Sequence, residues 1–162
     1  MISKLSISNL DCIFKIVNTA SVAYMGVIPN DRYKKPYMSK VELKKEMGDG
    51  VVFYGFFKQS KIIGIMGIQQ VKDVTLIRHA YVIPMYQKMG IGRLLLKYLL
   101  GLSKTKRVFV GTWRAASWAI RFYENNGFML VSKEKKDNLL SRYWKIPKRQ
   151  IETSVVLEYK FR

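Results

Sequence analysis

The chain has 162 residues, of which 49% are apolar and 25% charged, and this length and composition fit one globular domain over residues 1–162. It holds one cysteine (Cys12) and one histidine (His79), no run of about 18 apolar residues and no leader-like N-terminus, so we expect a cytoplasmic protein without a disulfide, a metal site or a membrane span. The net charge of +18 fits an anionic ligand, an acidic partner, nucleic acid or simply a solvated basic surface.

The first part of the chain is predicted to hold a short strand and two helices. A strand at 2–7 precedes a helix capped by Asn9, whose apolar residues recur at helical spacing: Ile13, Ile16, Val17, Ala20 and Tyr24. Residues 26–38 contain two prolines and are expected to form a loop. Ser39, with Glu42 three residues later, forms a capping box for a short second helix.

The middle of the chain is predicted to form an antiparallel meander. Residues 51–57 and 62–68 are continuous apolar runs joined by a short link, which indicates a hairpin buried on both faces. A third strand over 74–83 follows another short connection and stops at Pro84, because proline cannot donate to a sheet ladder.

A long amphipathic helix follows this third strand. It starts near Gly90, and its buried face is expected to comprise Ile91, Leu94, Leu95, Tyr98, Leu99 and Leu102. The next strand, 107–112, is reached through that helix, so it should pair in parallel with the strand at 74–83.

The last part of the chain is predicted to alternate helices and strands. Residues 113–128 indicate a second amphipathic helix that stops at Gly127, with a buried face made of Ala115, Trp118, Ala119 and Phe122. A strand begins at Phe128, a short helix lies within 135–144, and 154–161 form a closing strand.

The turn QKMGIG, residues 87–92, is the most informative stretch. Gly90 and Gly92 lie where the helix begins, although glycine costs about 1 kcal/mol in a helix, and the unpaired N–H groups at such an end attract a phosphate. Gln87, Lys88 and Arg93 would add donors, while glycines used only for tight packing are the alternative. No P-loop run and no early GxGxxG are present, which argues against those two phosphate sites.

Two motifs resemble those of the GNAT superfamily of N-acetyltransferases. QKMGIG follows a strand ending in V-x-P and is similar to the family's pyrophosphate loop for acetyl-coenzyme A (acetyl-CoA). In AASWAIRFYENNGF, residues 115–128, the family's A, F-Y-E and G-F elements match Ala119, Phe122, Tyr123, Glu124, Gly127 and Phe128. The two motifs have the family's order and spacing and lie within residues 74–128.

The resemblance implies an α/β (α+β) fold with a mixed, mostly antiparallel sheet of six to seven strands. That sheet is expected to splay between its fourth and fifth strands, to carry helices on both faces and to hold acetyl-CoA, the co-substrate, in the gap. The implied cofactor contacts are the backbone of Ala80, Tyr81 and Val82 for the pantetheine arm, and Gln87, Lys88, Met89, Gly90, Ile91, Gly92 and Arg93 for the pyrophosphate.

One position departs from the family pattern. The family often has an asparagine three residues before the matched alanine, and this chain has Ala116 there. Ser117, Arg114 or a main-chain group would replace the asparagine's contact with the pantetheine arm, or that contact is missing.

The implied reaction is direct attack of a primary amine on the thioester within a ternary complex. Tyr123 matches the family tyrosine thought to protonate the coenzyme A sulfur, and a phenol of pKa about 10 can act as an acid; a purely structural tyrosine is the alternative. The glutamate base that the family often places on the fourth strand is absent, so His79 is the candidate base, with a water chain or a structural histidine as alternatives.

The acceptor is implied to lie against residues 20–40 and 135–150. Aromatic candidates for its pocket are Tyr24, Tyr33, Tyr37, Trp113 and Trp144. A small amine, an amino-acid derivative or a protein amino group would serve, and the chain is expected to be a monomer or a homodimer.

Two alternatives belong to other functional classes. The interleaved lysines and aromatics allow a basic nucleic-acid-binding module, which would leave the glycine turn and Tyr123 unexplained. The missing glutamate allows a catalytically silent sensor that binds an acyl-CoA, although Tyr123 is retained.

Overall fold

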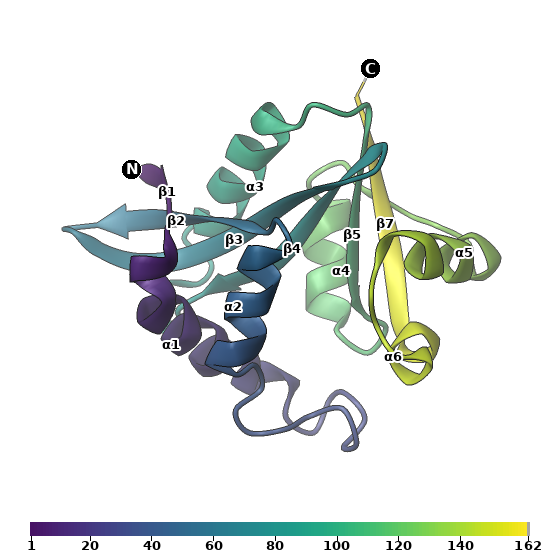
Figure 1. The fold of residues 1–162 in the computed structure, drawn as a ribbon, viewed down its shortest axis with the longest axis horizontal. Coiled ribbons are helices and arrows are strands. Elements are labelled where there is room, and N and C mark those ends of the chain that lie inside the picture. Colours follow the sequence, from purple (N-terminus) through teal and green to yellow (C-terminus); the bar gives the residue numbers. More distant parts are fainter. Residues whose placement is uncertain (162) are drawn as a thin grey trace.

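The computed structural model describes residues 1–161 and shows a mixed seven-stranded sheet with helices on both faces (Figure 1). The strands lie in the order β1-β2-β3-β4-β5-β7-β6, and within residues 1–161 every neighbouring pair is antiparallel except β4 and β5. Their bounds are β1 Ile2–Lys4, β2 Val52–Lys58, β3 Lys61–Val71, β4 Val74–Val82, β5 Arg107–Trp113, β6 Met129–Leu130 and β7 Ser154–Lys160. The predicted meander, hairpin and parallel pair are confirmed.

The helices form two layers around the sheet (Figure 1). α3 and α4 pack on one face, while α1, α2 and α5 pack on the other. Their bounds, with the short α6, are α1 Leu10–Ala20, α2 Lys40–Gly48, α3 Ile91–Leu102, α4 Ser117–Glu124, α5 Lys133–Tyr143 and α6 Lys148–Thr153. None of the helices in this part of the chain is both long enough and apolar enough to span a lipid bilayer.

The buried face of α3 is rotated from the predicted one. The buried residues are Ile91, Leu95, Leu96 and Leu99. Leu94, Tyr98 and Leu102 were expected in the core, but they are 49%, 42% and 39% exposed. The helix carries apolar side chains on more than one side, so the sequence is compatible with several choices of buried face. Packing on the twisted sheet determines which of them is buried.

The prediction for α4 was wrong for two of its four residues. Trp118 is 45% exposed and Ala115 is exposed, whereas Ala119 and Phe122 pack against the core as expected. In and just before α4, the buried residues are Ala116 and Tyr123. Gly127 follows the helix at φ +89°, which confirms the predicted stop because glycine adopts the left-handed conformation without a steric penalty. α6 was not predicted, since its six residues are too few to show a helical period.

The caps of the first two long helices differ in outcome. Asn9 does not cap α1 with its side chain; instead its Oδ1 accepts the backbone N–H of Ser6, 2.9 Å away, and closes the preceding turn. Ser39 forms the predicted capping box of α2, because its Oγ accepts the Glu42 N–H at 3.1 Å and the Glu42 carboxylate accepts the Ser39 N–H at 2.7 Å.

Replacing Ser39 by alanine is expected to lower the free energy of unfolding by about 1 kcal/mol, because the Glu42 N–H at the start of α2 loses its acceptor. Urea denaturation measures this loss. Ser117→Ala is the matched control, since Ser117 is exposed at the start of α4 and its side chain makes no cap hydrogen bond. Equal stability of the wild type and Ser39→Ala would show that the capping box contributes nothing.

The sheet opens between β4 and β5. These strands pair only over Thr75 to Ile77 and Val108 to Val110, so the remaining residues of both strands leave the ladder. The predicted splay between the fourth and fifth strands is therefore confirmed, and it leaves the end of β4 paired with β3 but without a partner strand on the β5 side.

Candidate active site

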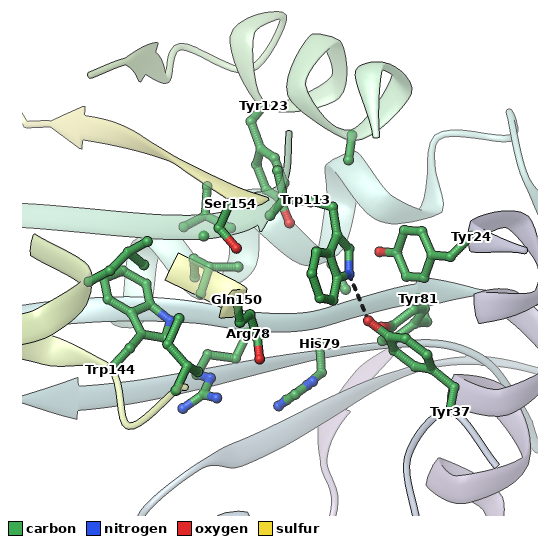
Figure 2. Close-up of a pocket in the computed structure, with 18 residues that line it drawn as sticks. Tyr24, Tyr37, Arg78, His79, Tyr81, Trp113, Tyr123, Trp144, Gln150 and Ser154 are labelled. Atoms are coloured by element: carbon green, nitrogen blue, oxygen red, sulfur yellow. Dashed lines mark hydrogen bonds between the residues drawn. The ribbon is translucent and has the colours of Figure 1, made fainter. Parts of the chain in front are cut away.

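A cavity of about 150 Å³ lies where β4 and β5 diverge (Figure 2). It is lined by residues 77–81 of β4 and 110–113 of β5. Tyr123 of α4 borders it on one face of the sheet, and Trp144, which follows α5, borders it on the other. The cavity therefore brings groups from the two helical layers together through the gap in the sheet.

A β-bulge in β4 shapes the edge of this cavity. Tyr81 pairs with Ile65 and Arg78 with Gly67, so His79 and Ala80 together face the single residue between those partners on β3. His79 has φ +53°, a left-handed conformation that is uncommon outside glycine. Because a bulge bends and twists its strand, it turns the end of β4 away from β5 and leaves the main chain of residues 80–82 facing the gap.

The N-terminus of α3 presents unpaired backbone donors. Its first hydrogen bond runs from the Leu94 N–H to the Gly90 carbonyl at 3.0 Å, so the N–H groups of Ile91, Gly92 and Arg93 have no partner inside the helix. Gly90 has φ +81°, and a Cβ built there would meet nothing within 4 Å. The predicted phosphate turn thus combines free amides, the positive end of a helix dipole and open space beside them, which fits a diphosphate.

The two glycines of this turn have different roles. Gly90 is required by its backbone conformation. A Cβ on Gly92 would lie 3.4 Å from the Phe122 ring, an ordinary contact distance, so this position faces α4. Gln87 and Lys88 precede the helix, and the Gln87 amide donates to the Val82 carbonyl at 3.1 Å, at the end of β4.

Tyr123 has a buried ring and a hydroxyl that reaches the cavity. The ring is 5% exposed and packs edge-on against Phe122 and Phe128, with centroid distances of 5.0 and 5.4 Å. Its hydroxyl makes no hydrogen bond within residues 1–161. It is also not among the fully buried polar atoms without a partner, so it is accessible from the cavity. Burial raises the pKa of Tyr123 well above its ordinary value, so the phenol stays protonated at neutral pH.

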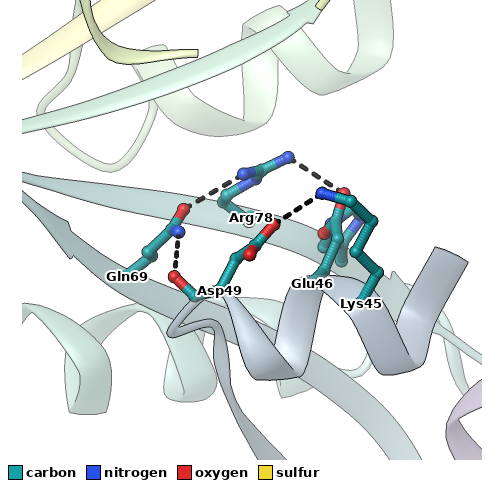
Figure 3. A network of polar contacts seen from close by, with 6 residues as sticks. Lys45, Glu46, Asp49, Gln69 and Arg78 are labelled. Atoms are coloured by element: carbon teal, nitrogen blue, oxygen red, sulfur yellow. Dashed lines mark hydrogen bonds and ion pairs between the residues drawn. The ribbon is translucent and has the colours of Figure 1, made fainter. Parts of the chain in front are cut away.

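His79 also lines the cavity, and its ring contacts an acid that the sequence analysis missed. Its Nε2 contacts the Oε2 of Glu46, on α2, and its ring stacks on Phe53 at 5.8 Å. Arg78 donates to the other Glu46 oxygen at 3.2 Å and to Gln69 at 3.1 Å (Figure 3). Glu46 is more than thirty residues from His79 in the chain, and no motif connects the two.

Aromatic side chains border the cavity at two ends. Tyr24, Tyr37 and Trp113 line one end, and Trp144, which follows α5, lines the other; all four were proposed from the sequence for an acceptor pocket. Tyr33 does not; it packs against Tyr37 with ring centroids 6.0 Å apart. The Trp113 Nε1–H donates to the Tyr37 hydroxyl at 2.8 Å, which fixes both rings at the cavity wall (Figure 2).

The candidates for the missing asparagine contact lie apart from this cavity. Ser117 is exposed and Arg114 donates to the Glu152 carbonyl, and neither residue lines the gap between β4 and β5. Ala116 is fully buried. Residues 1–161 also contain no group of three or more His, Cys, Asp or Glu side chains placed to hold a metal ion.

Comparison with known proteins gives a family match over most of the chain. The model of the acetyltransferase (GNAT) domain matches residues 19–142. No curated protein matches the sequence.

Solved structures share the fold at low sequence identity. The PaiA N-acetyltransferase of Thermoplasma acidophilum, in complex with coenzyme A, superposes with a TM-score of 0.75 at 21% identity over 99% of this chain and 98% of that one. A GNAT-family acetyltransferase of Staphylococcus aureus gives 0.75 at 15% identity, over 100% of this chain and 99% of that one. The ribosomal-protein-alanine N-acetyltransferase of Brucella melitensis gives 0.69 at 14%, over 99% of both chains.

Proposed function

Because the chain belongs to the GNAT acetyltransferase family, we propose that it moves an acetyl group from acetyl-CoA to a primary amine by direct attack in a ternary complex. The observation that carries the proposal is the gap between β4 and β5, where main chain of β4 without a partner on the β5 side and Tyr123 line one cavity. The free amides that begin α3 follow β4 in the chain, after a short turn. A PaiA N-acetyltransferase of the same fold binds coenzyme A, which supports acetyl-CoA as the donor.

The donor would be held by main-chain groups on both sides of the bend after β4. The unpaired backbone of Ala80, Tyr81 and Val82 would hydrogen-bond the amides of the pantetheine arm, as a neighbouring strand does. The amides of residues 89–93 and the basic side chains of Lys88 and Arg93 would hold the pyrophosphate. Gln87 would have to leave the Val82 carbonyl if the arm pairs there.

The proposed chemical step needs an acid and a base. The amine nitrogen forms a bond to the thioester carbonyl carbon, the carbon–sulfur bond breaks, and the thiolate of coenzyme A leaves. Tyr123 would give its proton to that sulfur, since its protonated hydroxyl lacks another partner within residues 1–161. His79, on the opposite side of the gap, would take the proton that the amine loses.

The acceptor would lie against the aromatic lining of the cavity, between Tyr24, Tyr37 and Trp113 at one end and Trp144 at the other. A small amine, an amino-acid derivative and a protein amino group are the candidate acceptors, so an amine panel has to include each class.

Saturating acetyl-CoA is expected to stabilise the fold. At a ligand concentration of about 100 times Kd, linkage gives about 2.7 kcal/mol, which raises the Tm by about 5–10 °C for a chain of this size. Thermal melting with acetyl-CoA tests binding, and release of free thiol with a panel of amines tests transfer. A nucleotide that lacks the pantetheine arm and its thioester serves as the ligand control.

The two alternative functions predict different outcomes. A silent acyl-CoA sensor would show the Tm shift without thiol release from any amine. A nucleic-acid module would show salt-dependent binding to DNA or RNA and no shift with acetyl-CoA, which would overturn the proposal.

A further inference from the structure

Within residues 1–161, Glu46 is the acidic side chain that contacts the lining of the cavity through His79. One of its carboxylate oxygens contacts His79 Nε2, and the other accepts a hydrogen bond from Arg78 at 3.2 Å. The carboxylate is therefore held at both oxygens, by two consecutive residues of β4. The side chain is only 22% exposed, so these contacts are largely shielded from solvent.

The bulge in β4 explains how two consecutive residues reach one carboxylate. In a regular strand, neighbouring side chains point to opposite faces of the sheet. Here Ile77 and Ala80 pack with α3 on one face, while Arg78 and His79 both turn toward α2 on the other. The positive φ of His79 is a strained conformation, and such strain is often found at functional sites. Without the bulge His79 would face away from Glu46.

The second ring nitrogen of His79 is free. Nδ1 makes no hydrogen bond within residues 1–161. It is also not among the fully buried atoms without a partner in this part of the chain, so it is accessible to a small molecule. His79 lines the cavity, and stacking on Phe53 at 5.8 Å restrains its ring plane. The ring thus has one nitrogen fixed on a carboxylate and the other open.

The charges around His79 keep this carboxylate ionised. Burial acts to raise the pKa of Glu46, but the contacts with His79 and the charge of Arg78 outweigh it and hold that pKa below its ordinary value. The other titratable groups that face the cavity are phenols whose pKa values burial raises, so they stay neutral: Tyr24, Tyr37, Tyr81 and Tyr123.

We propose that Glu46 is a positioning residue for His79: its carboxylate accepts the Nε2–H, which leaves Nδ1 unprotonated and directed to the acceptor amine. This inference rests on the proposed acetyl transfer. As the amine nitrogen bonds to the thioester carbon, its proton passes to Nδ1, and the resulting imidazolium lies against the Glu46 carboxylate before it releases the proton to solvent. The Glu46 carboxylate on α2 thus supports, through His79, the removal of the amine proton that a glutamate on β4 would perform directly.

The tautomer of His79 can be observed without any substrate, because it is the single histidine of the sequence. In long-range ¹H–¹⁵N correlation spectra of the untagged wild type above neutral pH, we expect the pattern of an imidazole protonated at Nε2. A pattern protonated at Nδ1, or an equal mixture of both tautomers, would overturn the proposal even if no variant folds.

Glu46→Gln tests the role of the carboxylate. We expect about a tenfold lower kcat with an unchanged KM for acetyl-CoA, and a shift of the rising limb of the pH profile to lower pH, because the imidazolium formed during the reaction loses its stabilising charge. A merely structural role would not move this limb.

Asp49→Asn is the matched control. It also removes one negative charge beside α2, but Asp49 pairs with Lys45 and does not contact His79 (Figure 3). Its pH profile should match that of the wild type. Equal shifts in both variants, or no shift in Glu46→Gln, would overturn the proposal. Absence of thiol release by the wild type would instead count against acetyl transfer, and the tautomer measurement separates these two failures.

Discussion

Tyr123→Phe is expected to lower kcat about a hundredfold and to leave the affinity for acetyl-CoA nearly unchanged. General acid catalysis typically contributes two or more orders of magnitude, and this phenol, which lines the cavity on the side of α4, is the proposed proton donor. The phenylalanine ring keeps the edge-on contacts with Phe122 and Phe128, so the core beneath the site is preserved. Steady-state thiol release and calorimetric titration with acetyl-CoA separate the two parameters.

Tyr143→Phe provides the matched control for the loss of one phenolic hydroxyl. Tyr143 is buried on α5 and donates to the Asp73 carboxylate at 2.8 Å, outside the cavity. Its replacement should cost about 1 kcal/mol of stability and leave kcat unchanged. An unchanged kcat in Tyr123→Phe would remove Tyr123 from the mechanism, and an equal fall in both variants would point to a general loss of rigidity.

The parts of the fold that could be predicted from the sequence depend on local rules. The capping box of Ser39 and Glu42, the helix stop at Gly127 and the glycine turn before α3 each involve residues within a few positions of one another. Chain connectivity added the parallel pairing of β4 and β5, since a helix joins them.

The features that sequence analysis missed depend on packing between distant segments. Packing on the twisted sheet determines which side of α3 and of α4 is buried, and the helical period of the sequence does not contain that information. Glu46 reaches His79 only because a bulge turns two consecutive side chains of β4 to the same face. A bulge of this kind leaves no mark in the apolar pattern of residues 74–83.

Gly90→Val is expected to weaken acetyl-CoA binding about thirtyfold, which corresponds to about 2 kcal/mol. Gly90 has φ +81°, and a β-branched residue is strongly disfavoured there, so the backbone should rotate and redirect the amides that begin α3. A Cβ at Gly90 would meet nothing within 4 Å, so the new side chain would occupy open space beside those amides and leave the core untouched. Calorimetric titration with acetyl-CoA measures the change.

Gly26→Val separates the loss of the binding turn from a general backbone penalty. Gly26 has φ +73° and equally open surroundings, but it lies in the loop after α1, away from α3. Both variants should therefore lose similar stability, because the same conformational cost arises at each position. Only Gly90→Val should lose affinity for acetyl-CoA, since only Gly90 precedes the amides that have no helical partner. Unchanged affinity in Gly90→Val would mean that the pyrophosphate binds elsewhere, and the glycine turn would then be explained by packing alone.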